Sequence, residues 1–545
     1  MSTVARPSAG SRAAVHTPFL TPGTRVATAL AVLVAQVGLA IPAVLNGLFQ
    51  EDLHTTSAQL TWISDAFLVP VTLLELTFGV LGDLFGRKRL LIGGSLLMAI
   101  GEALSVLTPR AGASNTGAVS LLWTGQALTG IGAAVLFPTT LAMVAAGTHT
   151  VRDRARGIAI WAAALSSGGF VSPLLGGLVT KLHWGGSETA VWRWAFVAVG
   201  ILALISMAVA TLAQNSSAPE GRSLDFGGQI TIAVSLFALL FAVIQGSTWG
   251  WSNGWVIGGF IAAVVFFALF ITAERRSPAP LLRLELFRSR AFSINSIITV
   301  VGMFAFLGTA YTTSIRLAAI QGFSPLKTAI AFVLLQGFAL VLMPLTAKVI
   351  HSYNPRWALT GGFALIGAGD LWAATQSAAD LSIWPIVGPL VLVGIGFAFA
   401  LSGVTAVAVN TVPGHLAGMA SGTTSQLRDF GFTLGPAVIG AIALSQAAAA
   451  LQAKITASPQ LQSALAAFDK QAPPEVVGAI HSGPLGANAI PGNPLKSLAF
   501  AALDHAYAVG YVVCGVAALA AAVLAAAGLS GTADRPLVTE ESLTD

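Results

Sequence analysis

The chain has 545 residues, of which 55% are hydrophobic and only 9% are charged, with a mean hydropathy of +0.80. Ordinary soluble proteins carry about 25% charged residues, so this composition excludes a soluble domain and indicates a polytopic membrane protein. The single cysteine, Cys514, excludes an intrachain disulfide.

Apolar runs of about 20 residues, the length that crosses a bilayer as a helix, recur along the chain. Residues 1–23 are polar and lack the apolar core of a signal peptide. We predict fourteen spans, at residues 25–48, 59–82, 90–108, 119–145, 155–180, 190–213, 227–246, 254–273, 291–315, 328–350, 357–377, 383–408, 416–447 and 499–528.

Positive charge is distributed unevenly between the two sides that these spans define. With the N-terminus inside, the inner segments hold 18 of the 27 Lys and Arg residues and the outer segments hold 7. Short cytoplasmic loops are enriched in Lys and Arg. The bias therefore predicts that both termini are cytoplasmic and that the number of spans is even.

Two connecting segments are long. Residues 274–290 are basic and interleaved with Leu and Phe, which favours a surface helix on the inner leaflet. Residues 448–498 are rich in Ala and Gln, then in Pro and Gly, and lie outside in this topology. They are equally consistent with a helical hairpin over the exit and with a flexible loop.

An internal repeat relates the third and eleventh spans. Gly93-Gly94, six residues and Gly101-Glu102 align with Gly361-Gly362, six residues and Gly369-Asp370. Ser172-Pro173 aligns in the same way with Gly435-Pro436. The repeat predicts two six-helix halves separated by an inserted pair, and transporters built from such parallel repeats bind substrate near mid-membrane between the halves.

Four motifs carry a resemblance to a known family. They are Gly79-Val-Leu-Gly-Asp-Leu-Phe-Gly-Arg-Lys-Arg-Leu-Leu91, Gly168-x3-Ser-Pro-x2-Gly-Gly177, Trp192-Arg-Trp-Ala-Phe196 and the stretch from Gly418 to Gly431. In this order, on these spans, they resemble the fourteen-span drug:proton antiporters of the major facilitator superfamily, of the EmrB/QacA type. The resemblance covers nearly the whole chain.

The resemblance implies an all-α polytopic membrane protein with a major facilitator fold of 14 transmembrane helices, in a 6 + 2 + 6 order, with both termini cytoplasmic. The expected organisation is an N-terminal tail, an N-terminal six-helix bundle, an inserted pair with the basic loop, a C-terminal six-helix bundle that includes the outer loop 448–498, and a C-terminal tail. These parts cover residues 1–24, 25–215, 216–290, 291–528 and 529–545.

The loop motif between the second and third spans joins small residues, one carboxylate and three cations. Gly79 and Gly82 would let a neighbouring helix approach, and Gly86 would permit the turn. By resemblance, Asp83 is a conformational latch between the halves, with Arg87 as its partner. The alternative is a topology signal, which would explain the cations but not Asp83.

The fifth span carries the antiporter motif. Pro173 removes a backbone donor and bends the helix. Gly168, Gly176 and Gly177 let the helix pack tightly against a partner, and Ser172 stands where the family usually has glycine. A tight helix pair is the minimal interpretation, and the link of this motif with export is analogy.

Ionisable residues inside spans are functional candidates because their burial is costly. Glu75, near the middle of the second span, faces protein by helical spacing. We predict that it lies close enough to Arg428 to pair across the halves, with Asp429 nearby. A proton carrier and a static buried ion pair both fit. Asp65, in the outer part of the same span, is a further proton-coupling candidate or a helix-end residue.

Three further charged residues have structural interpretations. Glu102 and Asp370 take equivalent positions in the two halves, where structural hydrogen bonding or snorkelling is expected. Arg316 is expected at an interface near an outer helix end.

Two positions depart from the family pattern. The first span has Leu33 where the family usually carries Asp, and the fourth has Gln126 where it usually carries Arg. Either the coupling group has moved, with Glu75 as its substitute, or the protein is not an ordinary proton antiporter. Gln36 and Gln126 are expected to face a central cavity and to bind substrate by hydrogen bonds.

These features predict a secondary transporter in the inner membrane that exports amphipathic or cationic small molecules, driven by proton entry. The sequence has no nucleotide-binding Gly-x4-Gly-Lys-Ser/Thr motif, and we expect no enzyme activity, cofactor, metal site or nucleic-acid partner. The expected partners are substrate, protons and lipid, around a monomer. Two alternatives remain open: a dedicated exporter of one endogenous lipid or antibiotic-like metabolite, and a non-transporting receptor or assembly protein.

Overall fold

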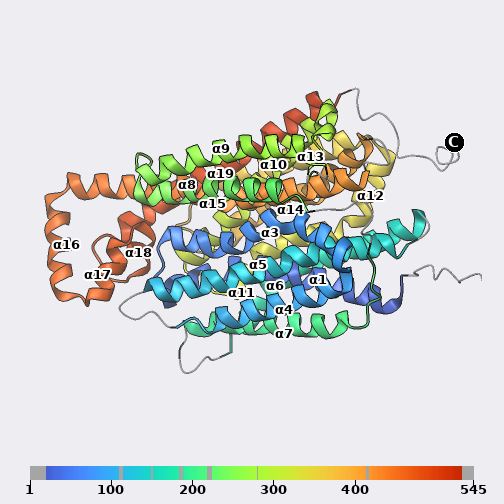
Figure 1. The fold of residues 1–545 in the computed structure, drawn as a ribbon. Coiled ribbons are helices and arrows are strands. Elements are labelled where there is room, and N and C mark those ends of the chain that lie inside the picture. Colours follow the sequence, from blue (N-terminus) through green and yellow to red (C-terminus); the bar gives the residue numbers. More distant parts are fainter. Residues whose placement is uncertain are drawn as a thin grey trace, which may run out of the picture.

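The computed structural model describes residues 20–109, 115–148, 151–182, 187, 189–217, 224–278, 280, 282–412 and 417–530. These residues form an elongated bundle of helices (Figure 1). A group of short helices projects from one end, which we call the hairpin end. The opposite end, where Asp83 and Gly86 lie, is called the loop-motif end.

In its described residues the N-terminal half contains six long helices and three short segments. Their close packing follows from their composition, because Gly and Ala on facing surfaces let helix backbones approach. The long helices are α1 (Pro22–Ala40), α3 (Ser57–Phe85), α4 (Arg87–Val106), α5 (Asn115–Ala146), α6 (Val151–Val179) and α7 (Arg193–Ala210). The short segments are η1 (Ile41–Val44) and α2 (Asn46–Leu53), between α1 and α3, and a single turn, η2 (Ala190–Trp192), precedes α7.

The C-terminal half repeats this plan. It comprises α10 (Arg290–Ser314) with the π-helical turn η4 (Ile315–Ile320), α11 (Pro325–Val341), α12 (Met343–Ser352), α13 (Pro355–Ala374), α14 (Trp384–Asn410), α15 (Ala417–Ala457) and α19 (Lys496–Gly528). Helices α11 and α12 form a single path bent by 50° at Leu342. Pro344, in the first turn of α12, has no backbone donor to continue α11.

The inserted pair, α8 (Phe226–Trp249) and α9 (Gly254–Arg276), lies along the outside of the bundle (Figure 1). Helix α8 packs against α3 of one half and α15 of the other. Its Leu240 and Ile244 share a buried cluster with Val69 and Ala437. The α8–α9 pair therefore covers one edge of the surface along which the two halves contact each other, which we call the seam.

The segment at the hairpin end is helical, which decides between the two interpretations of residues 448–498. Helix α15 runs on to Ala457 and is followed by α16 (Pro459–Gln471), α17 (Pro474–His481) and α18 (Pro484–Ala489). The segment has its own apolar core, which includes Leu451, Leu465 and Ile480. Helix α18 contacts α2 of the N-terminal half and η4 of the C-terminal half.

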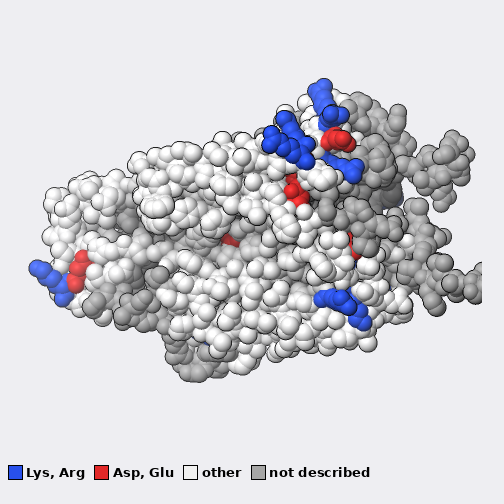
Figure 2. Space-filling view, in the orientation of Figure 1, with Lys and Arg blue, Asp and Glu red and all other residues white. Residues whose placement is uncertain are grey.

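Twelve helices in the described part of the chain are long and apolar enough to cross a membrane, and the bent pair α11–α12 makes thirteen. Helix α13, which coincides with the predicted span 357–377, is not among them. It carries Arg356 and Asp370 and packs against α14 and α19. In Figure 2 the middle of the visible face is almost free of charged side chains, as a membrane-crossing region requires.

The predicted surface helix over 274–290 is wrong for the described residues. Helix α9 ends at Arg276, and beyond it only a short 3-10 helix, η3 (Leu284–Arg288), forms. Five exposed arginines lie in this segment, namely Arg275, Arg276, Arg283, Arg288 and Arg290. Figure 2 shows Lys and Arg gathered toward the end of the molecule away from the hairpin.

Candidate functional site

The loop motif forms a buried ion pair at a tight turn. The Arg87 guanidinium donates to Asp83 Oδ1 at 2.7 Å, and both side chains are 9% exposed. Arg87 also donates to Ser216 Oγ at 3.2 Å, which ties the turn to the segment after α7. Gly86 has φ = +98°, a conformation that favours glycine. The predicted Asp83–Arg87 contact is thus present, within the N-terminal half.

The prediction that Gly79 and Gly82 of the loop motif let a neighbouring helix approach closely is wrong. A Cβ atom added at Gly79 would lie 3.6 Å from Pro138, and one at Gly82 would lie 3.4 Å from the Arg87 side chain. These are ordinary van der Waals distances, so neither position needs glycine for close approach in this arrangement. The spacing identifies the motif but does not show how far away the neighbouring helix lies.

The α6 motif places glycines on two faces. A Cβ at Gly168 would lie 2.6 Å from the carbonyl oxygen of Leu33, and one at Gly177 would lie 2.6 Å from the Cα of Leu326. Gly176 faces η1, which continues α1, and Ser172 donates to the carbonyl oxygen of Val37 of α1 at 2.8 Å. Helix α6 therefore packs on α1 with one face and on α11 of the other half with the next.

A carboxyl pair and an arginine meet where α3 and α15 pack together. Glu75 of α3 is 6% exposed and lies within hydrogen-bonding reach of the Asp429 carboxyl of α15. Arg428 donates to Asp429 at 2.8 Å and 3.1 Å. The ion pair that the structure records is therefore Arg428–Asp429, and Arg428 acts on Glu75 through its charge.

Hydrogen bonds made by uncharged side chains flank this group, and the sequence analysis did not predict them. Thr72 and Thr433 join α3 to α15 at 2.8 Å, and Gln426 donates to the carbonyl oxygen of Thr72 at 3.4 Å. Gln229 of α8 bonds to Thr77 and to the carbonyl oxygen of Leu73, one on each side of Glu75. Thr and Gln are frequent in spans, so nothing in their spacing distinguished them.

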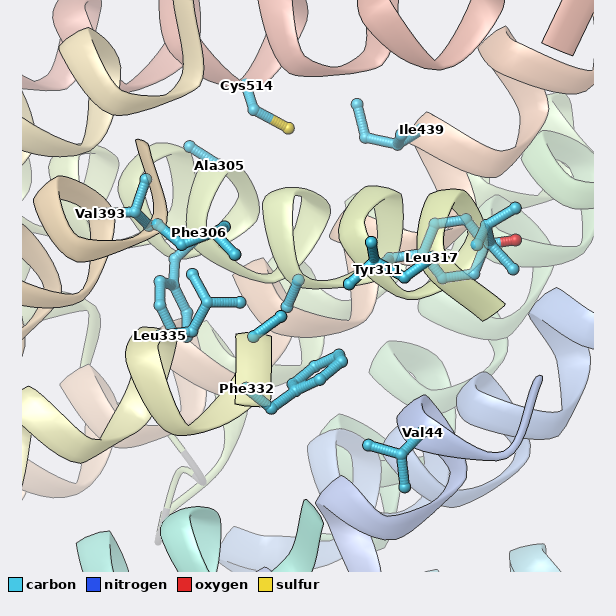
Figure 3. Packing of buried hydrophobic residues seen from close by; sticks show 14 of the residues in the cluster. Val44, Ala305, Phe306, Tyr311, Leu317, Phe332, Leu335, Val393, Ile439 and Cys514 are labelled. Carbon is cyan, nitrogen blue, oxygen red and sulfur yellow. The ribbon is translucent and has the colours of Figure 1, made fainter. Parts of the chain in front are cut away.

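A small cavity of about 50 Å³ lies between the halves, toward the hairpin end. Its polar lining consists of neutral groups, namely Asn46, Ser64, Tyr311, Ser314 and Gln336, and the rest is apolar. Figure 3 shows Tyr311 on α10 and Phe332 on α11, both lining residues, with Phe332 toward Val44 of the N-terminal half.

The cavity is closed at the hairpin end by direct contact of the halves. Asn46 donates to Ser314 at 2.8 Å, and Ser314 donates to the carbonyl oxygen of Ala43. A Cβ at Gly47 would lie only 2.7 Å from the carbonyl oxygen of Ala318. Because these contacts join α2 and η1 to α10 and η4, opening this end requires the halves to separate.

The two predicted cavity glutamines have different locations. Gln36 lies beside Gly168 and near Gly169, where the cavity residue Gln336 of α11 also reaches, but Gln36 itself is not among the residues that line the cavity. Gln126 does not face the cavity, which corrects the prediction. It is fully buried and donates to Ser105 of α4 at 3.0 Å, because α4 packs directly on that face of α5.

The remaining span charges are more deeply buried than expected. Glu102 and Asp370 are 0% exposed, so neither snorkels. Thr309 donates to Asp370 at 2.7 Å, whereas Glu102 has no hydrogen-bond partner among the described residues. Arg316 is 3% exposed, so the predicted interfacial position is wrong. Asp65 is also 0% exposed and lies near Tyr311.

Comparison with known proteins agrees with this architecture. Residues 26–229 and 226–436 match the family model described as Major Facilitator Superfamily. The tetracenomycin C resistance and export protein of Streptomyces glaucescens is 29% identical over 432 residues, covering 78% of this chain and 76% of that protein. Multidrug resistance protein Stp of Mycobacterium tuberculosis is 31% identical over 396 residues, covering 72% and 70%.

Solved structures share the fold. The inward open xylose transporter XylE of E. coli aligns with a TM-score of 0.59 at 12% identity, covering 95% of this chain and 98% of that chain. A bacterial homolog of the lysosomal transporter Spinster, inward-facing and unoccupied, aligns with a TM-score of 0.58 at 15% identity, covering 95% and 100%. The chain therefore belongs to the Major Facilitator Superfamily, in its drug:proton antiporter family, and is a multi-pass membrane transporter.

Proposed function

We propose that this protein is a secondary transporter that exports amphipathic small molecules in exchange for protons. The observation that carries the proposal is the buried group of Glu75, Asp429 and Arg428, placed where the two halves meet. Relatives named for multidrug resistance and for antibiotic resistance and export support the direction of transport.

The geometry supports a role in proton exchange. Two carboxyl groups within hydrogen-bonding reach cannot both be ionised cheaply, so one of them holds a proton that the other accepts. With that proton bound, Arg428 and the remaining carboxylate balance each other. Loss of the proton leaves one uncompensated negative charge on the seam, which favours separation of α3 from α15 and entry of water. Proton binding and release are thereby linked to the packing of the halves.

The cavity lining suits the substrate class. Apolar walls with a few neutral hydrogen-bonding groups bind amphipathic molecules. The lining described here contains no charged side chain, so it gives no reason to prefer cations over neutral compounds. Asn46, Ser64, Tyr311, Ser314 and Gln336 would orient the polar parts of a ligand.

The proposal includes a topology. Fourteen spans with both termini in the cytoplasm require α13 to cross the membrane as well, which its burial between α14 and α19 supports. The exposed arginines after α9 would then face the cytoplasm, and the hairpin end would face the outside of the cytoplasmic membrane.

The test uses inside-out vesicles, an imposed proton gradient and a fluorescent amphipathic substrate. The wild type should accumulate substrate and dissipate the gradient. The Glu75→Gln variant should show rates of substrate accumulation and of gradient dissipation that are at least tenfold lower. Glu102→Gln is the matched control, because Glu102 is also a buried carboxyl but lies within the N-terminal half, beside α1 and α7. Transport that ignores the gradient, or that survives in Glu75→Gln, would contradict proton antiport through this group.

A dedicated exporter of one metabolite is the second candidate, favoured by similarity to a protein named for tetracenomycin C resistance and export. A panel of chemically unrelated compounds separates the two. A dedicated exporter should reduce accumulation of one structural class only, whereas a multidrug exporter should reduce several. A chain that transports none of them in a gradient-dependent way would favour the non-transporting alternative.

A further inference from the structure

Asp65 is a buried acid whose carboxyl has no hydrogen-bond partner in the described part of the chain. Its side chain lies on α3, toward the hairpin end, and the residue is 0% exposed. Neither carboxyl oxygen has a hydrogen-bond partner among the described residues, and the ion pairs found in that part of the chain do not involve Asp65. An ion buried in this way is far costlier than the neutral acid. The closed arrangement is therefore compatible with a protonated Asp65 and disfavours the carboxylate.

The group that faces Asp65 belongs to the other half of the molecule. Tyr311 of α10 lies near Asp65. The Tyr311 hydroxyl bonds to Thr61 at 2.9 Å, one helical turn before Asp65, and to Tyr507 of α19. The neighbouring helices α5 and α8 contain no charged residue, and Arg428, Asp429 and Lys454 are the charged residues of α15.

The covering of this face of α3 depends on closure of the seam. Thr61 is covered by Tyr311 and by α15, where a Cβ at Gly440 would lie 2.8 Å from Thr61 Oγ1. Ser64 and Leu68, on either side of Asp65 in sequence, line the cavity between the halves. If the hairpin end opens, α10 and α15 move away from this face and water reaches Asp65.

We propose that Asp65 is a second proton-binding site, located in the gate at the hairpin end. Its carboxylate binds a proton from water on that side while the halves are apart, and only the neutral acid is buried when they close. The step forms one O–H bond on Asp65, and the proton returns to water when the gate opens again. This inference builds on the proposed antiport function by adding a condition for closure, distinct from exchange at Glu75 and Asp429.

Glu102 shows why gate-dependent protonation is expected at Asp65 and not at every buried acid of the protein. It is equally buried and also lacks a partner among the described residues. Its surroundings, however, are Gly38 of α1 and Gly200 of α7, both within the N-terminal half. Separation of the halves leaves that environment intact, so its protonation should not depend on the gate.

The experiment measures the distance between spin labels across the hairpin end. Full-length protein with Cys514→Ala, which removes the buried native thiol, receives Lys181→Cys and Ala379→Cys, exposed positions on opposite halves. Distance distributions are recorded in lipid nanodiscs at about pH 5 and about pH 8. The short distance should dominate in acid, and the open-to-closed ratio should rise with pH by up to about tenfold per pH unit.

Variants decide the outcome. Asp65→Asn, a permanently neutral isostere, should show the short distance at both pH values, whereas Asp65→Glu and Glu102→Gln should keep the pH response. The variants are compared in a Glu75→Gln background, so that the Glu75–Asp429 carboxyl pair cannot supply the pH response. A Glu75→Gln protein that does not respond to pH, or an Asp65→Asn/Glu75→Gln protein that still responds, would overturn the proposal. The measurement uses no substrate or gradient, so its failure is separate from a failure of Glu75-dependent export.

Discussion

Asp52 illustrates how a buried charge can be structural rather than functional. It accepts from Arg193 at 2.8 Å and from the Trp192 indole at 2.9 Å, and both ionic side chains are 4% exposed. Arg193 also donates to the carbonyl oxygen of Thr108 at 2.7 Å and lies over the Trp192 ring. The Trp192–Phe196 motif thus fastens the start of α7 to α2 and to the end of α4.

Removing one partner of this pair should be strongly destabilising. Asp52→Ala leaves the Arg193 guanidinium buried without its counter-ion, at an expected cost of about 3–5 kcal/mol. Thermal unfolding of the purified protein should show a clearly lowered Tm. Asp469→Ala is the control, because the Asp469–His481 pair on the hairpin is solvent-accessible, and its loss should cost about 0–1 kcal/mol. Equal effects of the two substitutions would contradict this account.

Single residues show the limits of prediction at this scale. The sequence identified Glu75, Arg428 and Asp429 because charged residues inside apolar runs are rare and stand out. It could not identify Asn46, Ser314 or Gln336 as cavity residues. Their positions depend on how two helices from different halves face each other, which no local spacing encodes.

Helix pairs α4–α5 and α13–α14 show what the internal repeat means physically. A Cβ at Gly101 would lie 2.5 Å from the backbone nitrogen of Thr129, and one at Gly369 would lie 2.7 Å from the carbonyl oxygen of Pro389. Gly93 and Gly361 are also equivalent in the repeat, and a Cβ added at either of them would meet no atom within 4 Å. The repeat therefore conserves a pattern of contact and clearance between corresponding helix pairs in one chain.

The repeat gives a matched set of substitutions. Gly101→Ala and Gly369→Ala each force a helix backbone to shift and should lower Tm and the yield of folded protein. Gly93→Ala and Gly361→Ala meet nothing within 4 Å and should be neutral or slightly stabilising, because alanine favours a helix by up to about 1 kcal/mol over glycine. Fluorescence-detected size exclusion after heating measures all four, and a destabilised Gly93→Ala would contradict the packing described.

At the scale of the whole molecule, the helices of the hairpin end connect the two halves. Asn488 of α18 donates to the carbonyl oxygens of Ala319 and Ile320, both at 3.2 Å, in the turn after α10. Because α18 also contacts α2, it rests on the line where the halves meet. The hairpin should therefore favour the closed arrangement of this end.

Asn488→Ala should weaken that closure. The change leaves two buried carbonyl groups unbonded, at about 1–3 kcal/mol for each such loss. Hydrogen–deuterium exchange in residues 315–321 and 484–490 should accelerate about tenfold or more. Gln462→Ala is the control, since Gln462 also donates to two carbonyl oxygens, at 3.0 Å and 3.3 Å, but at an exposed corner of the hairpin. If both variants exchange alike, α18 does not hold the gate.

The sequence alone determined the class of the protein, the positions of its long helices, the family and the repeat, because apolar length, charge placement and glycine spacing are local properties. Only the tertiary structure decided that Gln126 faces α4, that Arg316 is buried, that α18 rests on both halves and that Asp65 lies near Tyr311. The reason is physical: whether a polar side chain faces lipid, a cavity or another helix depends on the rotation and depth of helices distant in sequence, and a bilayer accepts many such arrangements of the same apolar segments.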